Sequence, residues 1–359
     1  MLPPAPDRAA MSVRSAQFLS HLVRGGHAVD FAAANEWPAG AVPNALARLG
    51  VNDLGIRSYD AAAAYADAHA GDYGIVVLAW TQVAQRLLPI VRARAPRAFV
   101  VFDTQDVNHV REFRYARATG NVRALRRAML LKEWETAAAT AADCTIAITP
   151  VDAVALQAIA PQARIRVVTI AAPEPLPVGP RAGAELLFVG NFASPPNHDA
   201  AFVLAREVLP RVRAAVPEAT LTLAGSDPPD DVRALAGEAV RVTGYVPDLA
   251  PYHAAARVFV GALRFGSGVK GKVLEAMAAG LPIVASSIAA EGIDLADGRD
   301  ALIADDPAGQ AAAILRILGE PELGPRLARA AAEVIRRDHS AAAIDAQFSD
   351  VLSLRGSPR

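Results

Sequence analysis

The chain has little of what disulfide-bonded, membrane-spanning or nucleic-acid-binding proteins require. With one cysteine, Cys144, the chain cannot form an internal disulfide, which is typical of proteins of the reducing cytoplasm. The position of Cys144 in the apolar run CTIAI predicts that it is a buried core residue. No apolar run reaches the roughly 18 residues of a membrane-spanning helix, and we recognise no signal peptide ahead of Asp7. The formal net charge of −1 gives no electrostatic reason to expect nucleic acid as a partner. We therefore expect a cytoplasmic protein that is soluble or rests on a membrane surface.

Lysine is almost absent as well, and its few positions are informative. Only Lys132, Lys270 and Lys272 are lysine among 36 basic residues, and two of them lie in the segment GSGVKGK. A cation at a helix N-terminus is unfavourable by about 0.3–1 kcal/mol, because the helix dipole is positive there. Two cations at one helix start therefore indicate that an anion binds there. The alternative interpretation is an ordinary helix start whose lysines are solvated.

The segment 257–287 contains the clearest functional pattern of the chain. It reads as a strand (258–260), a glycine loop, a helix and a second strand that starts at Pro282. The loop therefore lies at the carboxyl end of a strand and at the N-terminus of a helix, where free N–H groups attract phosphate. Glu275, one turn into the helix, is placed to accept hydrogen bonds from sugar hydroxyls.

Strands and helices alternate along the chain, which predicts parallel sheets with helices on both faces. The first half has predicted strands at 74–80, 98–103, 144–148 and 165–169 and helices near 41–49, 60–70, 81–94 and 110–142. The second half has strands at 185–190, 219–225, 240–246, 257–262 and 281–286 and helices near 199–216, 229–236, 249–255 and 271–279. We predict an α/β protein of two Rossmann-like doubly wound domains that face each other across a crevice.

Composition gives the predicted domain boundaries. Residues 1–170 form the N-terminal domain, the stretch 171–184 is a linker rich in Pro and Gly, and 185–339 form the second domain. A last helix, 340–355, has an apolar face and is expected to pack back on the first domain.

The first domain opens without a strand. A helix starts at about Asp7, so either residues ahead of Met1 supply a first strand or the sheet lacks one. If the strand is encoded upstream, an extension of roughly ten to fifteen codons adds an apolar run and raises thermal stability. Asp7 caps the helix or, together with Arg8, faces an acceptor ligand at its N-terminus.

Three segments of the second half, LLFVGNFASPPNHDA, GYVPDL and LRFGSGVKGKVLEAMAAGLPIVAS, occur in a specific order and spacing. Together they resemble the nucleotide-binding domain of retaining glycosyltransferases of family 4, which have the GT-B fold. The resemblance covers most of residues 185–320. PPAPDR and FDTQDVNHVRE in the first half are more loosely similar to the acceptor domains of that family.

The resemblance implies a nucleotide-sugar donor site. Glu275 holds the ribose or the sugar, Lys270 and Lys272 supply charge for the leaving diphosphate, and Tyr245 and Val246 flank the base. The other implied donor-binding residues are Gly190, Asn191, Asn197, Gly266, Ser267, Gly268, Val269 and Gly271. The chain departs from the family at Ser267, where many members have Glu, and at Asn191 and Asn197, where many have Arg and Lys. The first of these departures leaves the donor sugar open.

The acceptor side is expected on the loop after the strand 98–103. The segment FDTQDVNHVRE places Asp103, Asp106 and His109 there. A neutral His109 orients the incoming hydroxyl or is an ordinary histidine at an exposed helix start, and the sequence leaves both open. We expect no metal and no other cofactor, because no His, Cys and carboxylate cluster has ligand spacing.

These residues predict transfer of a sugar from a nucleoside diphosphate to a glycan, a lipid-linked acceptor or another acceptor, with retention, in bacterial cell-envelope polysaccharide synthesis. Two alternatives remain, a nucleotide-sugar 2-epimerase on the same fold and a silent nucleotide-sugar-binding module. A basic run at 110–132 is either a solvated helix face or a surface for anionic lipid headgroups. Its cations are Arg111, Arg114, Arg117, Arg123, Arg126, Arg127 and Lys132.

Overall fold

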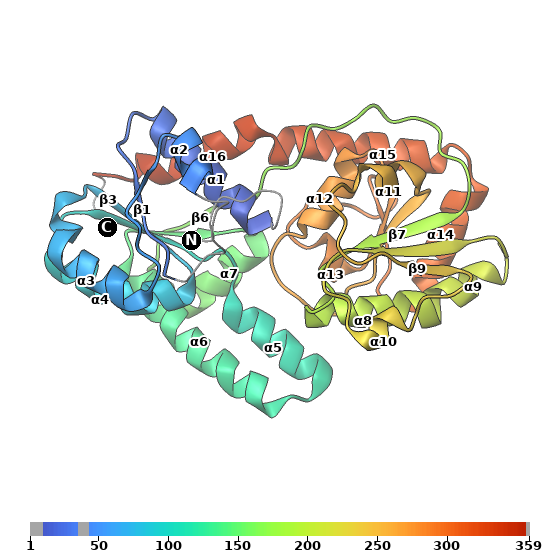
Figure 1. The fold of residues 1–359 in the computed structure, drawn as a ribbon, viewed down its shortest axis with the longest axis horizontal. Helices are drawn as coiled ribbons and strands as arrows, with labels where there is room; N and C mark the ends of the chain where they lie inside the picture. Colours follow the sequence, from blue (N-terminus) through green and yellow to red (C-terminus); the bar gives the residue numbers. More distant parts are fainter. Residues whose placement is uncertain (1–9, 35–42, 357–359) are drawn as a thin grey trace. The chain divides into compact units, whose positions relative to one another are not determined.

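The computed structural model describes residues 10–34 and 43–356, without the side chains of 10–13, 43 and 44. The chain divides into two compact units, which are treated separately below. Unit 1 is Met1–Ala171 with Ala341–Arg359, and unit 2 is Ala172–Ser340. The chain thus enters unit 2 once and returns to unit 1 for its last helix (Figure 1).

Unit 1 contains a parallel sheet with the strand order β3-β4-β5-β6 and a separate parallel pair, β1-β2. The strands are β1 (Asp30–Phe31), β2 (Asn52–Asp53), β3 (Ile75–Ala79), β4 (Phe99–Asp103), β5 (Cys144–Ala147) and β6 (Ile165–Val167). β4 and β5 are buried along their whole length, as expected for apolar strands covered on both faces. Cys144 is a core residue of β5, and burial raises the pKa of its thiol to about 12.

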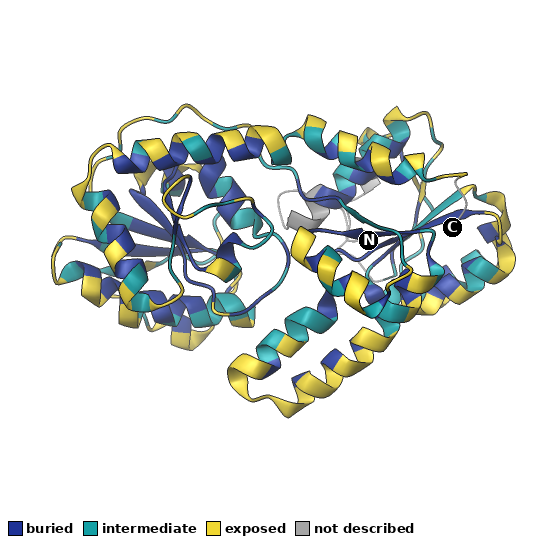
Figure 2. Cartoon of the chain, turned by 180° about the vertical axis from the view of Figure 1, so that it is seen from behind, coloured by how far each residue is buried: buried dark blue, intermediate teal, exposed yellow. Residues whose placement is uncertain are grey.

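Helices cover both faces of this sheet, and the residues toward the sheet are buried while the outer ones are exposed (Figure 2). They are α1 (Ala10–Arg24), α2 (Pro43–Arg48), α3 (Tyr59–His69), η1 (Ala70–Asp72), α4 (Thr81–Arg94), α5 (Asn108–Thr119), α6 (Val122–Ala141), α7 (Pro150–Ile159) and α16 (Ala341–Ser353). Phe348 of α16 stacks on Phe18 of α1 with 4.3 Å between ring centroids. The last helix therefore packs into the core of unit 1.

The region 110–142, predicted as one helical stretch, is two helices. Gly120 ends α5 with a φ of 70°, a left-handed conformation that favours glycine. The Asn121 side chain then caps α6 by accepting a hydrogen bond from the Ala124 N–H. α5 and α6 form an antiparallel hairpin (Figure 1). Helix α7, which the sequence reading left out, starts with a Thr149 cap and Pro150 in its first turn.

Unit 2 contains a six-stranded parallel sheet with the order β12-β11-β10-β7-β8-β9. The strands are β7 (Glu185–Val189), β8 (Thr220–Ala224), β9 (Val240–Val242), β10 (Val258–Gly261), β11 (Ile283–Ala285) and β12 (Leu302–Ile303). The chain runs outward from β7 through β8 to β9, then returns to β10 on the other side of β7. The strand order thus reverses between β7 and β10, the place where doubly wound sheets bind ligands at their carboxyl ends.

The connections of unit 2 place a helix after most strands. They are α8 (Pro195–Val203), η2 (Leu204–Val208), α9 (Leu209–Arg213), α10 (Asp230–Arg233), α11 (Ala250–Ala255), α12 (Gly271–Ala278), α13 (Ser287–Ala290), α14 (Pro307–Gly319), α15 (Leu323–Val334) and η3 (Ile335–His339). The predicted α/β class with parallel sheets is confirmed. In the part of the chain that the structure describes, no helix is long and apolar enough to cross a bilayer.

Candidate active site

The glycine loop after β10 and the segment after β7 lie where a doubly wound sheet such as that of unit 2 binds ligands. Both leave the carboxyl ends of neighbouring strands at the point where the strand order reverses. The β10 side supplies the loop 262–270 and the start of α12, and the β7 side supplies Gly190, Asn191 and Asn197. The residues implied for donor binding on these two segments therefore lie at one edge of one sheet.

Lys272 and Asn197 are brought together over Gly190. The Lys272 ammonium donates to Asn197 Oδ1, and Asn197 Nδ2 donates to the Asn191 carbonyl at 2.8 Å. A Cβ at Gly190 would lie 2.9 Å from Asn197 Cγ and 3.1 Å from Lys272 Nζ, so only glycine fits beneath this pair. Lys272 Nζ also lies 4.5 Å from the centroid of the Phe188 ring. The ammonium is thus fixed by contacts from β7 and α8.

Burial sets the charge state of this site. It lowers the pKa of Lys272 to about 7, helped by the neighbouring Lys270 and opposed by Glu275. Burial also raises the pKa of Glu275, and Lys272 opposes that shift. Among the described residues nothing hydrogen-bonds the Glu275 carboxylate. Lys272 is therefore poised to gain a proton when an anion binds, and Glu275 retains its capacity to accept hydrogen bonds.

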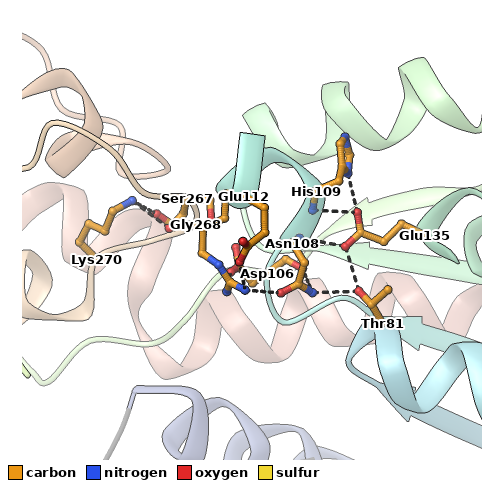
Figure 3. A network of polar contacts seen from close by, with 10 residues as sticks. Thr81, Asp106, Asn108, His109, Glu112, Glu135, Ser267, Gly268 and Lys270 are labelled. Atoms are coloured by element: carbon orange, nitrogen blue, oxygen red, sulfur yellow. Dashed lines mark hydrogen bonds and ion pairs between the residues drawn. The ribbon is translucent and has the colours of Figure 1, made fainter. Parts of the chain in front are cut away.

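Lys270 lies at the N-cap of α12 and is held by its own loop. Its ammonium donates to the Ser267 carbonyl at 3.0 Å and to the Gly268 carbonyl (Figure 3). The loop needs glycine at Gly266 (φ 145°), a conformation that other residues rarely adopt. Gly271 follows as the first residue of α12, where backbone N–H groups have no acceptor within the helix. The start of α12 thus lies beside two lysine side chains, Lys270 and Lys272.

The segment implied for the base lies after β9. Tyr245 is 65% exposed, Val246 is half-buried, and Gly244 accepts a hydrogen bond from the Gly225 N–H at 3.2 Å. A Cβ at Gly225 would come within 1.9 Å of the Gly190 oxygen, so close packing of the β7 and β8 ends requires glycine there.

On the acceptor side, in unit 1, His109 is anchored by a residue that the sequence reading missed. Its Nδ1 lies 2.5 Å from Oε2 of Glu135, whose side chain is fully buried in α6. Glu135 also accepts from the Thr81 hydroxyl at 2.9 Å and from the Asn108 N–H at 2.8 Å (Figure 3). An ionised carboxylate only accepts, so Nδ1 carries the proton and Nε2 remains for other partners. The only sequence signal for this role of Glu135 was its position as a single carboxylate among the apolar residues of one face of α6.

One of the acceptor-side residues, Asp103, differs in role from the sequence interpretation, and two others lie outside the described residues. Asp103 is not on an open loop. It ends β4 with no exposed surface, and its Oδ1 accepts from Arg14 Nη2 at 2.9 Å, so it is a core ion pair. Asp106 is partly exposed and its carboxylate accepts from Arg111. Asp7 and Arg8 lie outside the described residues. Within residues 10–34 and 43–356, no three His, Cys, Asp or Glu side chains gather as a metal site.

Residues 183–320 match the family model of glycosyl transferases group 1. Phosphatidyl-myo-inositol mannosyltransferase from Mycolicibacterium smegmatis is 33% identical over 169 residues, which are 45% of this chain and 43% of that protein. The match thus spans less than half the length of that curated relative.

Solved structures are similar over almost the whole chain. Sucrose-phosphate synthase from Thermosynechococcus elongatus has a TM-score of 0.73 at 19% identity, covering 95% of this chain and 92% of that one. HepE from Anabaena, solved in complex with UDP and glucose, has a TM-score of 0.70 at 14% identity, covering 96% of each chain. Such identities establish the fold. Residues 183–320 therefore match the model of glycosyl transferases group 1, in a chain whose α/β fold with parallel sheets matches GT-B glycosyltransferase structures.

Proposed function

We propose that this protein is a retaining glycosyltransferase of family 4 that uses a nucleoside diphosphate sugar. The observation that carries the proposal is the cluster of Lys272, Asn197 and Glu275 at the reversal of strand order in unit 2. A buried ammonium beside a helix start suits a diphosphate, and a carboxylate without a hydrogen-bond partner in the described chain suits sugar hydroxyls.

The transfer reaction requires stabilisation of the leaving diphosphate. As the bond between the anomeric carbon and the phosphate oxygen breaks, negative charge grows on the diphosphate. Lys272, Lys270 and the first N–H groups of α12 are fixed donors for that charge, which is where electrostatic stabilisation is most effective. Ser267 adds no carboxylate at the loop, so Glu275 is the acidic group that we assign to the donor.

His109 is our proposed acceptor-side residue. Because Glu135 holds Nδ1, Nε2 is the ring atom that remains to accept a hydrogen bond from an incoming hydroxyl or from the donor sugar. The buried Glu135 fixes the tautomer and the orientation of the ring, as a positioning residue.

The similar proteins support the substrate classes. One is named a phosphatidyl-myo-inositol mannosyltransferase and another was solved in complex with UDP-glucose. We therefore propose a nucleoside diphosphate hexose as donor and a glycan or lipid-linked acceptor, in cytoplasmic steps of envelope polysaccharide synthesis.

A thermal-shift screen tests the donor assignment. The protein is heated with UDP, GDP, ADP and their sugars, and one nucleotide series is expected to raise the Tm, because a ligand that binds only the folded state stabilises it more the tighter it binds. Product analysis by NMR then follows incubation with and without glycan acceptors. An epimer formed without acceptor, tight binding with no turnover over many acceptors, or no stabilisation by any nucleotide sugar would each contradict the proposal.

We further propose that the α5–α6 hairpin rests on an anionic membrane surface. Five of the nine exposed large apolar residues of the described chain lie on it, namely Phe113, Val122, Leu125, Met129 and Leu130. Val122, Leu125 and Met129 follow helical spacing on the exposed side of α6, and exposed arginines flank them in the sequence. Apolar side chains beside cations are the pattern of helices that lie in a lipid interface.

Vesicle sedimentation checks the membrane proposal with matched variants. Arg126→Ser combined with Arg127→Ser is expected to weaken binding to phosphatidylglycerol-containing vesicles by about 30-fold, since each cation contributes about 1 kcal/mol at such a surface. The control combines Arg326→Ser with Arg329→Ser, two exposed arginines of α15, and should bind as the unchanged protein does. Binding should also fade as salt rises. Equal binding to neutral and anionic vesicles, or none at low salt, would show that the hairpin is an ordinary solvated surface.

A further inference from the structure

The stretch predicted as a linker packs on unit 2 over residues 176–181, which form a strap across the end of α12. The Leu176 N–H donates to the Ala278 carbonyl at 2.7 Å. A Cβ added at Gly280, which has a φ of 71°, would lie 3.6 Å from Cγ2 of Val178, in ordinary contact. The strap is therefore held by unit 2 and follows the position of α12.

Arg181, the last residue of the strap, donates hydrogen bonds to the ends of two helices. Its Nη1 donates to the carbonyl of Ala256, the C-cap of α11, at 2.9 Å and to that of His253 at 2.6 Å. Its Nη2 donates to the carbonyl of Ala279, the C-cap of α12, at 2.6 Å, and Nε donates to that of Gly280 at 3.3 Å. A cation suits this position, because the carbonyl end of a helix carries partial negative charge.

The carbonyl end of α12 depends on the strap for part of its hydrogen bonding. The carbonyls of residues 275–277 accept from N–H groups of the chain that directly follows the helix, at 2.9 to 3.0 Å. The next two carbonyls, those of Ala278 and Ala279, accept from Leu176 and Arg181 of the strap. The last carbonyls of a helix have no partner within it. Loss of the strap would therefore leave these two without the partners that they have here.

The same guanidinium holds both ends of the segment that forms the glycine loop. From Ala256 the chain continues through β10, the loop 262–270 and α12 to Ala279. Arg181 contacts the carbonyls at the two ends of this segment, and its planar guanidinium keeps them at a fixed spacing. α12 has eight residues, a length of about 12 Å, so the helix start with Lys272 is fixed from the opposite end of a short rigid element.

Burial makes these contacts stronger than those of an ordinary surface arginine. Arg181 is half-buried, and burial, together with the neighbouring Arg257, lowers its pKa from the ordinary value. A cation that has lost part of its water needs acceptors in the protein to replace that water. The backbone carbonyls of the two helix ends supply them.

We propose that Arg181 is a positioning residue for the nucleotide sugar: it fixes the start of α12, and with it Lys270 and Lys272, where the diphosphate binds. This role rests on the proposed function, because it concerns the donor site of that function. Arg181 acts through α12, since it contacts the end of that helix opposite to the glycine loop. Precise placement matters at such a site, where a shift of about 1 Å costs up to about 100-fold in rate.

Arg181→Met and Arg181→Lys test this role, with Arg213→Met as the matched control. Arg213 is another half-buried arginine of unit 2 that donates to a backbone carbonyl, that of Ala219 at 2.8 Å. Calorimetry uses whichever of UDP, GDP and ADP stabilises the unchanged protein, at about pH 6, where Lys272 is mostly charged. Arg181→Met is expected to weaken binding about tenfold. Arg181→Lys should give an intermediate loss, because an ammonium keeps the charge without the planar fork.

The pH profile of binding separates positioning from a general loss of stability. Burial lowers the pKa of Lys272 to about 7, helped by Lys270 and opposed by Glu275. A helix start that shifts admits water to Lys272, so in Arg181→Met its pKa should rise and affinity should begin to fall at a higher pH. In the free protein, hydrogen exchange of peptides covering 262–275 should become about tenfold faster, while peptides from β8 stay unchanged.

Two results would overturn the role of Arg181. One is an Arg181→Met protein that binds the nucleotide as tightly as the unchanged protein, with the same pH profile. The other is an equal loss of affinity in Arg213→Met, which would indicate a general effect of stability. If Arg181→Met does not fold, Arg181→Lys decides by the same measurements. An unchanged protein that binds no nucleotide would contradict the proposed function instead, and exchange in 262–275 would still test whether Arg181 fixes the loop.

Discussion

Glu275→Gln is expected to lower sugar transfer by about 10- to 100-fold, the cost of removing a charged acceptor whose hydrogen bonds contribute roughly 1.5–3 kcal/mol. The change preserves the shape of the side chain and removes only its charge, so contacts with the surrounding helix should persist. Steady-state assays with the nucleotide sugar identified by the thermal-shift screen provide the measurement. Glu238→Gln, at an exposed glutamate of the same unit, is the matched control.

The same variant has an expected stability signature. Because burial raises the pKa of Glu275 above its ordinary value, the folded protein binds the proton more tightly than the unfolded chain does. The charged carboxylate therefore weakens the fold increasingly as pH rises through that pKa. Glu275→Gln should be at least as stable as the unchanged protein at neutral pH, as measured by urea unfolding. A variant with full turnover would remove Glu275 from the site, and one that unfolds would indicate a structural role instead.

Lys272→Ala should give the larger loss of nucleoside diphosphate affinity of the two loop lysines. Both Lys270→Ala and Lys272→Ala are expected to weaken binding, and the larger loss should exceed about 1 kcal/mol, since charge-assisted bonds to phosphate are involved. Lys270→Arg should restore little, because a planar guanidinium differs in shape from an ammonium that fits between two loop carbonyls. Lys132→Ala, on the exposed surface of α6, is the control.

The depressed pKa of Lys272 makes this binding depend on pH. The free protein has a Lys272 pKa of about 7, and a bound diphosphate should raise it, because an adjacent anion favours the charged ammonium. Between the two pKa values the neutral Lys272 amine takes up a proton on binding and becomes the ammonium, so affinity should fall as pH rises above about 7. Calorimetry in buffers of different ionisation enthalpy should show uptake approaching one proton, which Lys272→Ala should remove. Equal uptake in that variant, or unchanged affinity in both alanine variants, would exclude the lysines from the diphosphate site.

The sequence alone determined those features of the structure that depend on residues close to one another in the chain. Apolar runs such as FVVFD and LLFV predict strands buried on both faces. Their alternation with helices predicts parallel sheets, because each helix carries the chain back to the end of the sheet where the previous strand began. The glycine loop before Lys270 was visible for the same reason, since its turn and the helix start depend on local backbone preferences. The split at Gly120 was missed because one glycine within a helical pattern is also tolerated.

The tertiary structure decided which distant residues meet. Lys272 reaches Asn197, 75 positions earlier, only because β7 and β10 are adjacent in the sheet, and His109 reaches Glu135 across 26 positions because α6 folds back on α5. Strand order and helix packing follow from the burial of the whole core, which no local pattern contains. The same burial moves the pKa of Lys272 toward neutrality and converts Asp103 from an expected loop residue into a core ion pair. Residue types and their spacing thus predicted the chemistry of the site, while strand order and burial determined which residues contact one another and the charge state of Lys272.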